Sequence, residues 1–228
     1  MASLRDIRKR IASVKNTQKI TNAMKMVAAA KLRRAEEAVT AARPYSDKMR
    51  DVLMSLASRT NPSSHELLET GPVTKVLLIQ VTADRGLCGG FNANLNRRAD
   101  AFFREMKGKG AEIGLISVGR KGHDYFRRRQ IPIAGRFVNV MNNVTMELAG
   151  DIAREATEKF VSTEYQEVYL LYNRFRTAAT QILTLRKLLP VSAEDDAEKR
   201  REYLYEPSEE ELLAVILPKY IQVQIFSG

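Results

Sequence analysis

Three closely spaced glycines are the residues of this chain whose arrangement most invites a chemical interpretation. Gly86, Gly89 and Gly90 stand in the stretch TADRGLCGGFNANL, directly after an apolar run. A dinucleotide site requires G-x-G-x-x-G at the entry to a helix, and a phosphate loop requires a closing Gly-Lys-Ser/Thr. Neither pattern is present. The stretch therefore predicts a tight strand-to-helix turn in which glycine supplies unusual backbone angles, with Asp84 and Arg85 pairing to brace it.

The remaining reactive side chains do not form a recognisable site. His65 and His123 have no Cys or carboxylate partner at metal-ligand spacing, so no metal is expected. Cys88 has no base at a recognisable spacing, which favours burial or a subunit contact over nucleophilic work. As the single cysteine it excludes an intramolecular disulfide and fits a reducing compartment. We expect no catalytic residues and no cofactor.

The first 58 residues are predicted to form one long helix. Apolar or small residues recur at steps of three and four from Leu4 to Leu56, with one gap at Thr17. No glycine occurs before Gly71, and the only proline in the segment is Pro44, where we expect a bend.

The apolar stripe of this helix is narrow. Between Ala23 and Ala42 it consists mostly of Ala, Met and Val, without an aromatic residue. A neighbouring helix or a surrounding collar can therefore approach the helix axis closely. A helix of this length cannot bury its own stripe, so it requires a partner from this chain or from another protein.

The charge of the chain is concentrated at its start. Residues 1–34 carry ten Lys or Arg against one acid, Asp6, which is +9 of the total +10. A solvated helix face usually mixes the two signs. The pattern thus predicts a rod that works against an acidic surface, whether nucleic acid, anionic lipid or an acidic protein wall.

After a polar connector, strand and helix patterns alternate. The expected strands are Val76–Val81, Glu112–Val118, a weaker Ile131–Val140, Glu167–Asn173 and Thr180–Leu189, and the expected helices are Asn92–Met106, Lys121–Arg128 and Val144–Val161. This series predicts an α/β fold, a three-layer Rossmann-like domain with a mainly parallel sheet, attached to a long helix. The expected divisions are residues 1–58 (helix), 59–72 (linker), 73–207 (α/β domain) and 208–228 (start of a last helix).

The composition places the chain among globular proteins. Apolar residues make up 44% and charged residues 28% of the sequence. The longest apolar runs are far too short to span a membrane, and the N-terminus lacks the apolar core of a signal peptide. We expect any membrane association to pass through another subunit.

Three blocks of sequence carry a resemblance to a known family. They are LRDIRKRIASVKNTQKITNAMKMVAAAKLRRA (Leu4–Ala35), TADRGLCGGFNANL (Thr82–Leu95) and EYLYEPSEEELL (Glu202–Leu213). In this order and spacing the chain resembles the gamma subunit of F-type ATP synthases. The resemblance implies a central rotor shaft that performs no bond chemistry, with a long N-terminal helix that forms half of an antiparallel coiled coil.

The resemblance also implies partners and contact residues. The expected partners are the ring of alpha and beta subunits, the epsilon subunit and the membrane c ring, with no nucleic acid. The residues matched to the acidic levers of the beta subunits are Met24, Lys25, Lys31, Arg33, Arg34 and Cys88. Those matched to the foot that faces the c ring or epsilon are Tyr203, Tyr205 and Glu206.

Two further expectations follow from the resemblance. The family continues with a second long helix, and this sequence stops at Gly228 just as that helix begins, so the C-terminal helix is expected to be truncated. There is no regulatory insert or transit peptide of the chloroplast type. We therefore expect a bacterial protein, peripheral to the inner membrane on its cytoplasmic side.

Two other classes of function are compatible with parts of the pattern. A nucleic-acid-binding protein would explain a basic helix, although the stripe between Ala23 and Ala42 contains no stacking aromatics and the sequence shows no known DNA-binding module. An α/β enzyme is disfavoured because the phosphate loop is missing.

Overall fold

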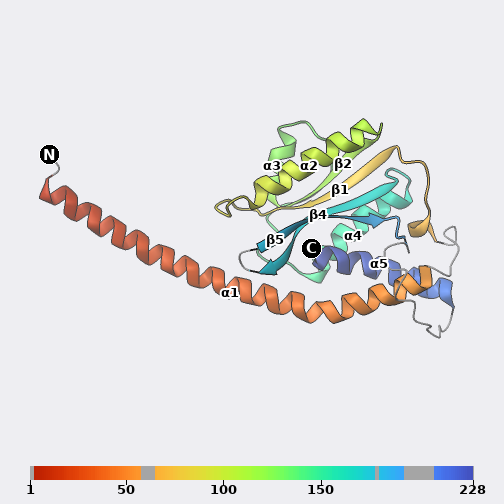
Figure 1. Cartoon of the computed structure of the whole chain (residues 1–228), viewed down its shortest axis with the longest axis horizontal. Coiled ribbons are helices and arrows are strands. Elements are labelled where there is room, and N and C mark those ends of the chain that lie inside the picture. The colour runs from red at the N-terminus through yellow and green to blue at the C-terminus, as the bar shows by residue number, and fades with distance from the viewer. Residues whose placement is uncertain (1–2, 58–64, 178–179, 193–207, 228) are drawn as a thin grey trace. The chain divides into compact units, whose positions relative to one another are not determined.

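The computed structural model describes residues 3–57, 65–177, 180–192 and 208–227 (Figure 1). Contacts divide the chain into two units, Met1–Tyr45 and Ser46–Gly228. Helix α1 (Leu4–Ala57) is continuous through Pro44 and is shared by both units. The predicted long helix is confirmed. At its start the Ser3 amide donates to the Asp6 carboxylate at 3.3 Å, as a capping box requires.

The first unit consists of the exposed part of α1. No side chain described between Leu4 and Arg34 is buried, and its large apolar side chains are well exposed. Ile20 and Met24 are 61% and 60% exposed, for example.

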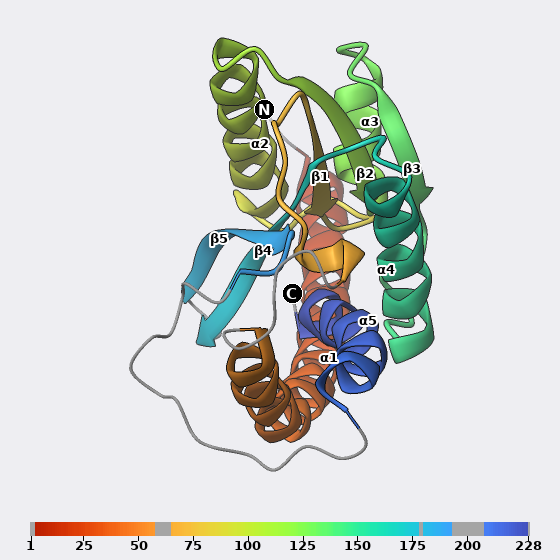
Figure 2. The same cartoon turned by 90° about the vertical axis from the view of Figure 1, so that its right-hand side faces the viewer.

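The second unit is built on a five-stranded sheet in the order β3-β2-β1-β4-β5 (Figures 1 and 2). Its strands are β1 (Lys75–Val81), β2 (Glu112–Val118), β3 (Ile133–Phe137), β4 (Glu167–Thr177) and β5 (Thr180–Leu189). The pairs β1–β2, β2–β3 and β1–β4 are parallel, so the predicted mainly parallel sheet is confirmed. Strand β5 returns antiparallel to β4 as a hairpin.

Helices cover both faces of this sheet. Helices α2 (Phe91–Gly108) and α3 (Arg120–Arg127) lie on one face, and α4 (Met146–Val161) and α5 (Glu209–Ser227) lie on the other (Figure 1). β1 alternates between the two cores, because Val76 and Leu78 face α2 while Leu77 and Ile79 face α4. A strand buried on both faces explains the continuous apolar run in its sequence.

The end of α1 is part of the α/β unit. Leu53 and Leu56 are fully buried in the core beside α4 and α5. The short helix η2 (Glu66–Leu68) adds two more buried side chains, Leu67 and Leu68, to the same core. The observed division of the chain therefore lies inside the helix, before Ser46, whereas the sequence pattern placed it after residue 58. The difference arises because the last turns of α1 contribute buried apolar side chains to the core of the α/β unit.

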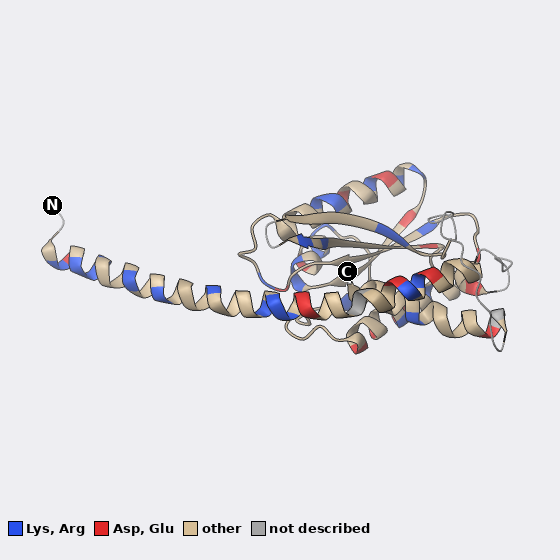
Figure 3. Ribbon diagram, turned by 60° about the horizontal axis from the view of Figure 1, so that its bottom comes forward, with Lys and Arg blue, Asp and Glu red and all other residues tan. Residues whose placement is uncertain are grey.

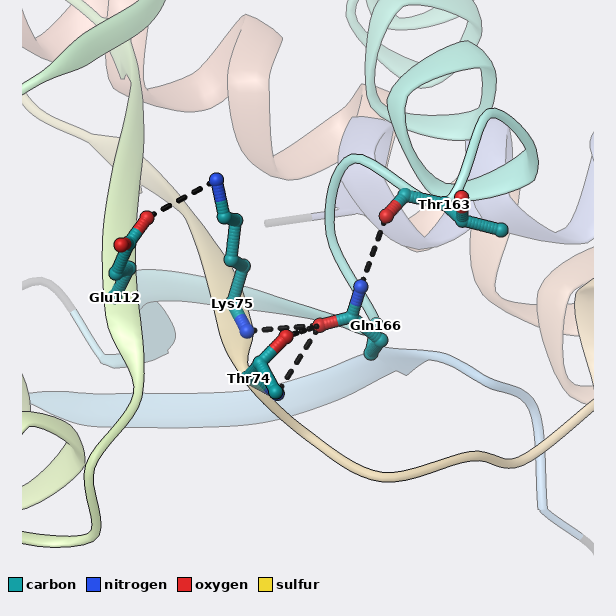
Figure 4. A network of polar contacts seen from close by, with 5 residues as sticks. All are labelled: Thr74, Lys75, Glu112, Thr163 and Gln166. Carbon is teal, nitrogen blue, oxygen red and sulfur yellow. Dashed lines mark hydrogen bonds and ion pairs between the residues drawn. The ribbon is translucent and has the colours of Figure 1, made fainter.

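A polar network fixes the edge of the sheet at which β1 and β4 begin (Figure 4). The Gln166 side-chain oxygen accepts hydrogen bonds from the Lys75 amide at 2.8 Å and from the Thr74 hydroxyl at 3.0 Å. The Gln166 amide group donates to the Thr163 carbonyl at 2.9 Å. Lys75 also forms an ion pair with Glu112 of β2 at 3.0 Å. One glutamine thus joins the start of β1 to the loop that enters β4.

We predict that Gly119→Ala lowers the free energy of unfolding of the α/β unit by more than about 1 kcal/mol. Gly119 adopts φ +92°, and a Cβ there would collide with the Thr82 carbonyl. Gly108→Ala is the matched control, because a Cβ at that helical position meets nothing within 4 Å. The control is expected to be neutral or slightly stabilising in urea unfolding. Equal urea midpoints for the Gly119→Ala and Gly108→Ala variants would contradict the requirement for glycine at position 119.

Candidate functional site: a charged helix and a braced glycine turn

The residues matched to the lever contacts on α1 are all exposed. Met24, Lys25, Lys31, Arg33 and Arg34 lie on the uncovered part of the helix. At about 3.6 residues per turn, Lys31 shares a side of the helix with Met24, whereas Arg33 lies on the opposite side. The basic residues therefore surround the helix instead of forming one face. Figure 3 shows them spread along its N-terminal half.

This charge is mostly uncompensated within the helix. Arg33 Nε contacts Glu37 Oε1 at 2.8 Å, and both side chains are largely exposed. No other basic residue among the described positions 3–34 forms an ion pair. Repulsion among the remaining charges is thus relieved only by solvent and salt.

Apolar surface accompanies the charge. Ile7, Ile11 and Val14, flanked by Arg10 and Lys15, line a shallow groove on the helix. Further along, Ile20, Met24, Met26 and Val27 are each more than half exposed. Contiguous apolar surface of this kind marks a site of protein interaction.

The glycine turn is braced by Asp84, with partners other than the expected Arg85. The Asp84 carboxylate accepts hydrogen bonds from the backbone amides of Asn139 at 2.7 Å, Arg120 at 2.9 Å and Met141 at 2.9 Å. Burial by itself would raise the pKa of Asp84, but the three amides outweigh it and hold that pKa below its usual value. The expected pairing of Asp84 with Arg85 is wrong, because three amides occupy the carboxylate.

Asn92, the second residue of α2, closes the other side of the turn. Its side-chain oxygen accepts from the Ala83 amide at 2.9 Å, and its nitrogen donates to Cys88 Sγ at 3.1 Å. Leu87 and Gly89 adopt positive φ, of 62° and 57°. The prediction of a tight turn with unusual backbone angles is confirmed, although a leucine takes one of those positions. The turn presents Leu87 to solvent, where it is fully exposed.

The predicted site residues occupy both units. Cys88 is exposed in the turn of the α/β unit, so the suggestion that it is buried was wrong, and a subunit contact remains a prediction. The lever-contact residues of α1 belong to the helical unit. Tyr203, Tyr205 and Glu206 lie outside the described residues.

The histidines have structural surroundings. His65 Nδ1 accepts a hydrogen bond from the Leu67 amide at 3.1 Å and caps η2. His123 is buried in α3, and burial together with nearby Arg136 lowers its pKa. No cluster of three potential metal ligands occurs within the described ranges. In the same part of the chain, no helix has the length and apolar character needed to cross a membrane.

Sequence comparison decides the family. The ATP synthase family profile matches residues 3–228. An ATP synthase gamma chain of Geobacter metallireducens is 52% identical over all of this chain and 80% of its own length. The chain belongs to the ATP synthase gamma chain family. A second gamma chain, of Pelotomaculum thermopropionicum, is 46% identical over the same shares of the two chains.

A solved structure shares the fold. It comes from the central stalk and c ring of the Tetrahymena thermophila mitochondrial ATP synthase, with a TM-score of 0.66 and 24% identity. The match covers 91% of this chain and 90% of that one.

We predict that Asp84→Asn destabilises the α/β unit by about 1–3 kcal/mol at neutral pH, because the amide cannot accept from all three backbone donors. A lowered folded-state pKa stabilises the fold above the unfolded value and loses that contribution as pH falls through the folded value. The difference between parent and variant should therefore shrink below about pH 4. Urea unfolding of both proteins between neutral pH and acid measures this difference in the free energy of unfolding. A difference that does not change with pH would contradict the role assigned to the Asp84 charge.

Proposed function

We propose that the chain is the central-stalk rotor subunit of a proton-translocating F-type ATP synthase. In this role it couples proton flow through the membrane c ring to ATP synthesis in the ring of alpha and beta subunits. The observation that carries the proposal is the long exposed helix in a chain of the gamma family, with apolar surface and basic side chains on every side.

The distribution of charge supports an encircling partner. Lys25, Lys31, Arg33 and Arg34 point in different directions from one helix, so a flat surface or a single groove reaches only part of them. A closed collar meets all of them at once. An acidic collar would also relieve the repulsion among ten basic residues and attract the helix at short range.

The glycine turn is the second contact proposed for the beta-subunit levers. Cys88 and the fully exposed Leu87 stand at the tip of the turn, on a backbone held by Asp84 and Asn92. An exposed leucine on a rigid turn offers an apolar contact at low entropic cost, because the backbone of the turn is already ordered before binding.

The foot is proposed from the sequence match alone. Tyr203, Tyr205 and Glu206 would face the c ring or the epsilon subunit. The chain would catalyse no reaction and bind no cofactor, since catalysis belongs to the beta subunits. We place it on the cytoplasmic side of a bacterial inner membrane, attached through the other subunits.

We predict that replacing Lys25, Lys31, Arg33 and Arg34 together by Gln weakens coupling more than it weakens assembly. Each exposed pair is worth about 0.2–1 kcal/mol, so the four together should reduce rotation-coupled proton pumping on the order of tenfold, and no single change should abolish it. The measurements are single-molecule rotation and ATP-driven proton pumping in reconstituted complexes at low salt.

The control for this variant keeps the charges and changes the side chains. Lys25→Arg, Lys31→Arg, Arg33→Lys and Arg34→Lys together should rotate and pump like the parent. If the Gln variant also behaved like the parent at low salt, the charges would have no role in coupling.

A further inference from the structure

The α/β unit carries a second concentration of positive charge, which the near-neutral total of residues 35–228 conceals. Residues 97–136 contain eleven Lys or Arg against four Asp or Glu, a net charge of +7. This stretch runs from α2 through α3 to β3. The charge therefore lies on the α2–α3 side of the sheet.

Five of these residues gather where α2 and α3 end. We call them the basic rim: Arg104, Lys107, Arg127, Arg128 and Arg129, all of them exposed. Both helices run back against the parallel strands, so their C-terminal ends lie at the edge where β2 and β3 begin. The rim thus occupies the amino edge of the sheet.

Three of the four acids in residues 97–136 are already engaged, and the fourth, Asp124 on α3, offsets only one of the five rim charges. The Tyr125 hydroxyl donates to Asp100 at 2.5 Å, which ties α3 to α2. Lys109 contacts Glu105 at 2.9 Å, and Lys75 contacts Glu112 at 3.0 Å. The positive charge of the rim is consequently available for an external partner.

Tyr125 also holds part of the rim in place. The Arg129 guanidinium lies 3.6 Å from the centre of the Tyr125 ring and donates to the Tyr125 carbonyl at 3.3 Å. The hydrogen bond to Asp100 raises the pKa of Tyr125, and the nearby charges of Arg129 and Arg104 oppose that rise. Residues of α2 and α3 therefore meet around one tyrosine.

The chemistry of the rim indicates the class of its partner. No large apolar side chain is exposed anywhere in residues 97–136, whereas protein interfaces usually have an apolar or aromatic centre. Arg129 covers one face of the Tyr125 ring, so that face is not open for stacking with a nucleic-acid base. Clustered guanidinium groups without an apolar centre suit a surface of phosphate groups.

We propose that the basic rim binds the headgroups of anionic phospholipids. The inference rests on the proposed function for the nearness of a membrane. The amino edge is also where β5 ends, since Leu189 pairs with Val168 there. In the sequence, β5 is followed by Tyr203–Glu206, the segment proposed to face the membrane ring.

The test must separate the rim from the basic N-terminal helix, which would also attract anionic vesicles. The chain contains no Trp, so a single Trp reports its own surroundings. Gly108→Trp places the reporter beside the rim in open space, and Ala93→Trp places it at the other end of α2, about 22 Å away at 1.5 Å per residue. Energy transfer to a dansyl headgroup lipid is measured on vesicles of phosphatidylcholine with and without phosphatidylglycerol.

The charge variants are made in the Gly108→Trp background. One replaces Arg104, Arg127 and Arg128 by Gln. Its matched control removes equal charge by replacing Arg97, in the N-terminal half of α2, and Arg120 and Lys121, in the first turn of α3, all of which are exposed. Circular dichroism melting checks that every variant folds. Each basic residue near an anionic surface contributes about 1 kcal/mol to binding. The affinity of the rim variant for phosphatidylglycerol vesicles, read by energy transfer, should therefore be on the order of 100-fold weaker than that of its parent.

The expected result is transfer from Gly108→Trp only on phosphatidylglycerol vesicles, weaker transfer from Ala93→Trp, and a marked loss in the rim variant but not in its control. Equal transfer from the two reporters, or equal affinity of the two triple variants, would overturn the proposal. Displacement by inorganic phosphate, or preference for duplex DNA over vesicles, would overturn the assignment to lipid. If the parent with its intact rim failed to bind phosphatidylglycerol vesicles while reconstituted complexes still rotated, the rim would be rejected and the rotor function left standing.

Discussion

The exposed surface of residues 4–34 is the constraint on which the rest of the structure depends. This part of α1 carries apolar side chains such as Ile20 and Met24, more than half exposed, and almost the whole net charge of the chain. Exposed apolar surface favours association, and clustered like charge opposes compaction. Both are satisfied together by a close-fitting partner of opposite charge. The α/β unit can then be understood as the body that holds this helix at its other end.

That body is constructed to be rigid where the helix and the turn emerge from it. Leu53 and Leu56 are fully buried beside α4 and α5, so the last turns of α1 cannot move without disturbing the core. Asp84 holds the glycine turn through three backbone amides, one from the first residue of α3 and two from the loop after β3. A rotor needs this property, because force applied to a loosely held element would be lost in local motion.

The sequence predicted the regular elements well and their environments less well. The apolar run Val76–Val81 and the periodic helices could be recognised because burial on two faces or on one stripe leaves a direct signal. The antiparallel return of β5 and the burial of Leu53 depend on tertiary packing, which periodicity does not encode. The partners of Asp84 are backbone amides more than thirty residues away, and no side-chain motif marks them. The basic rim was hidden because acids elsewhere in the unit balance its charge.

Footprinting of the lysines along α1 tests the central claim most directly. Lys9, Lys15, Lys19, Lys25 and Lys31 point in different directions around the helix and are exposed in the free chain. Amine acylation read by mass spectrometry compares the free chain with its complex with the alpha and beta subunits. An encircling collar predicts that all five lysines become protected together, while Lys107 at the end of α2 keeps its reactivity. Protection confined to one side of the helix, or none, would contradict the account.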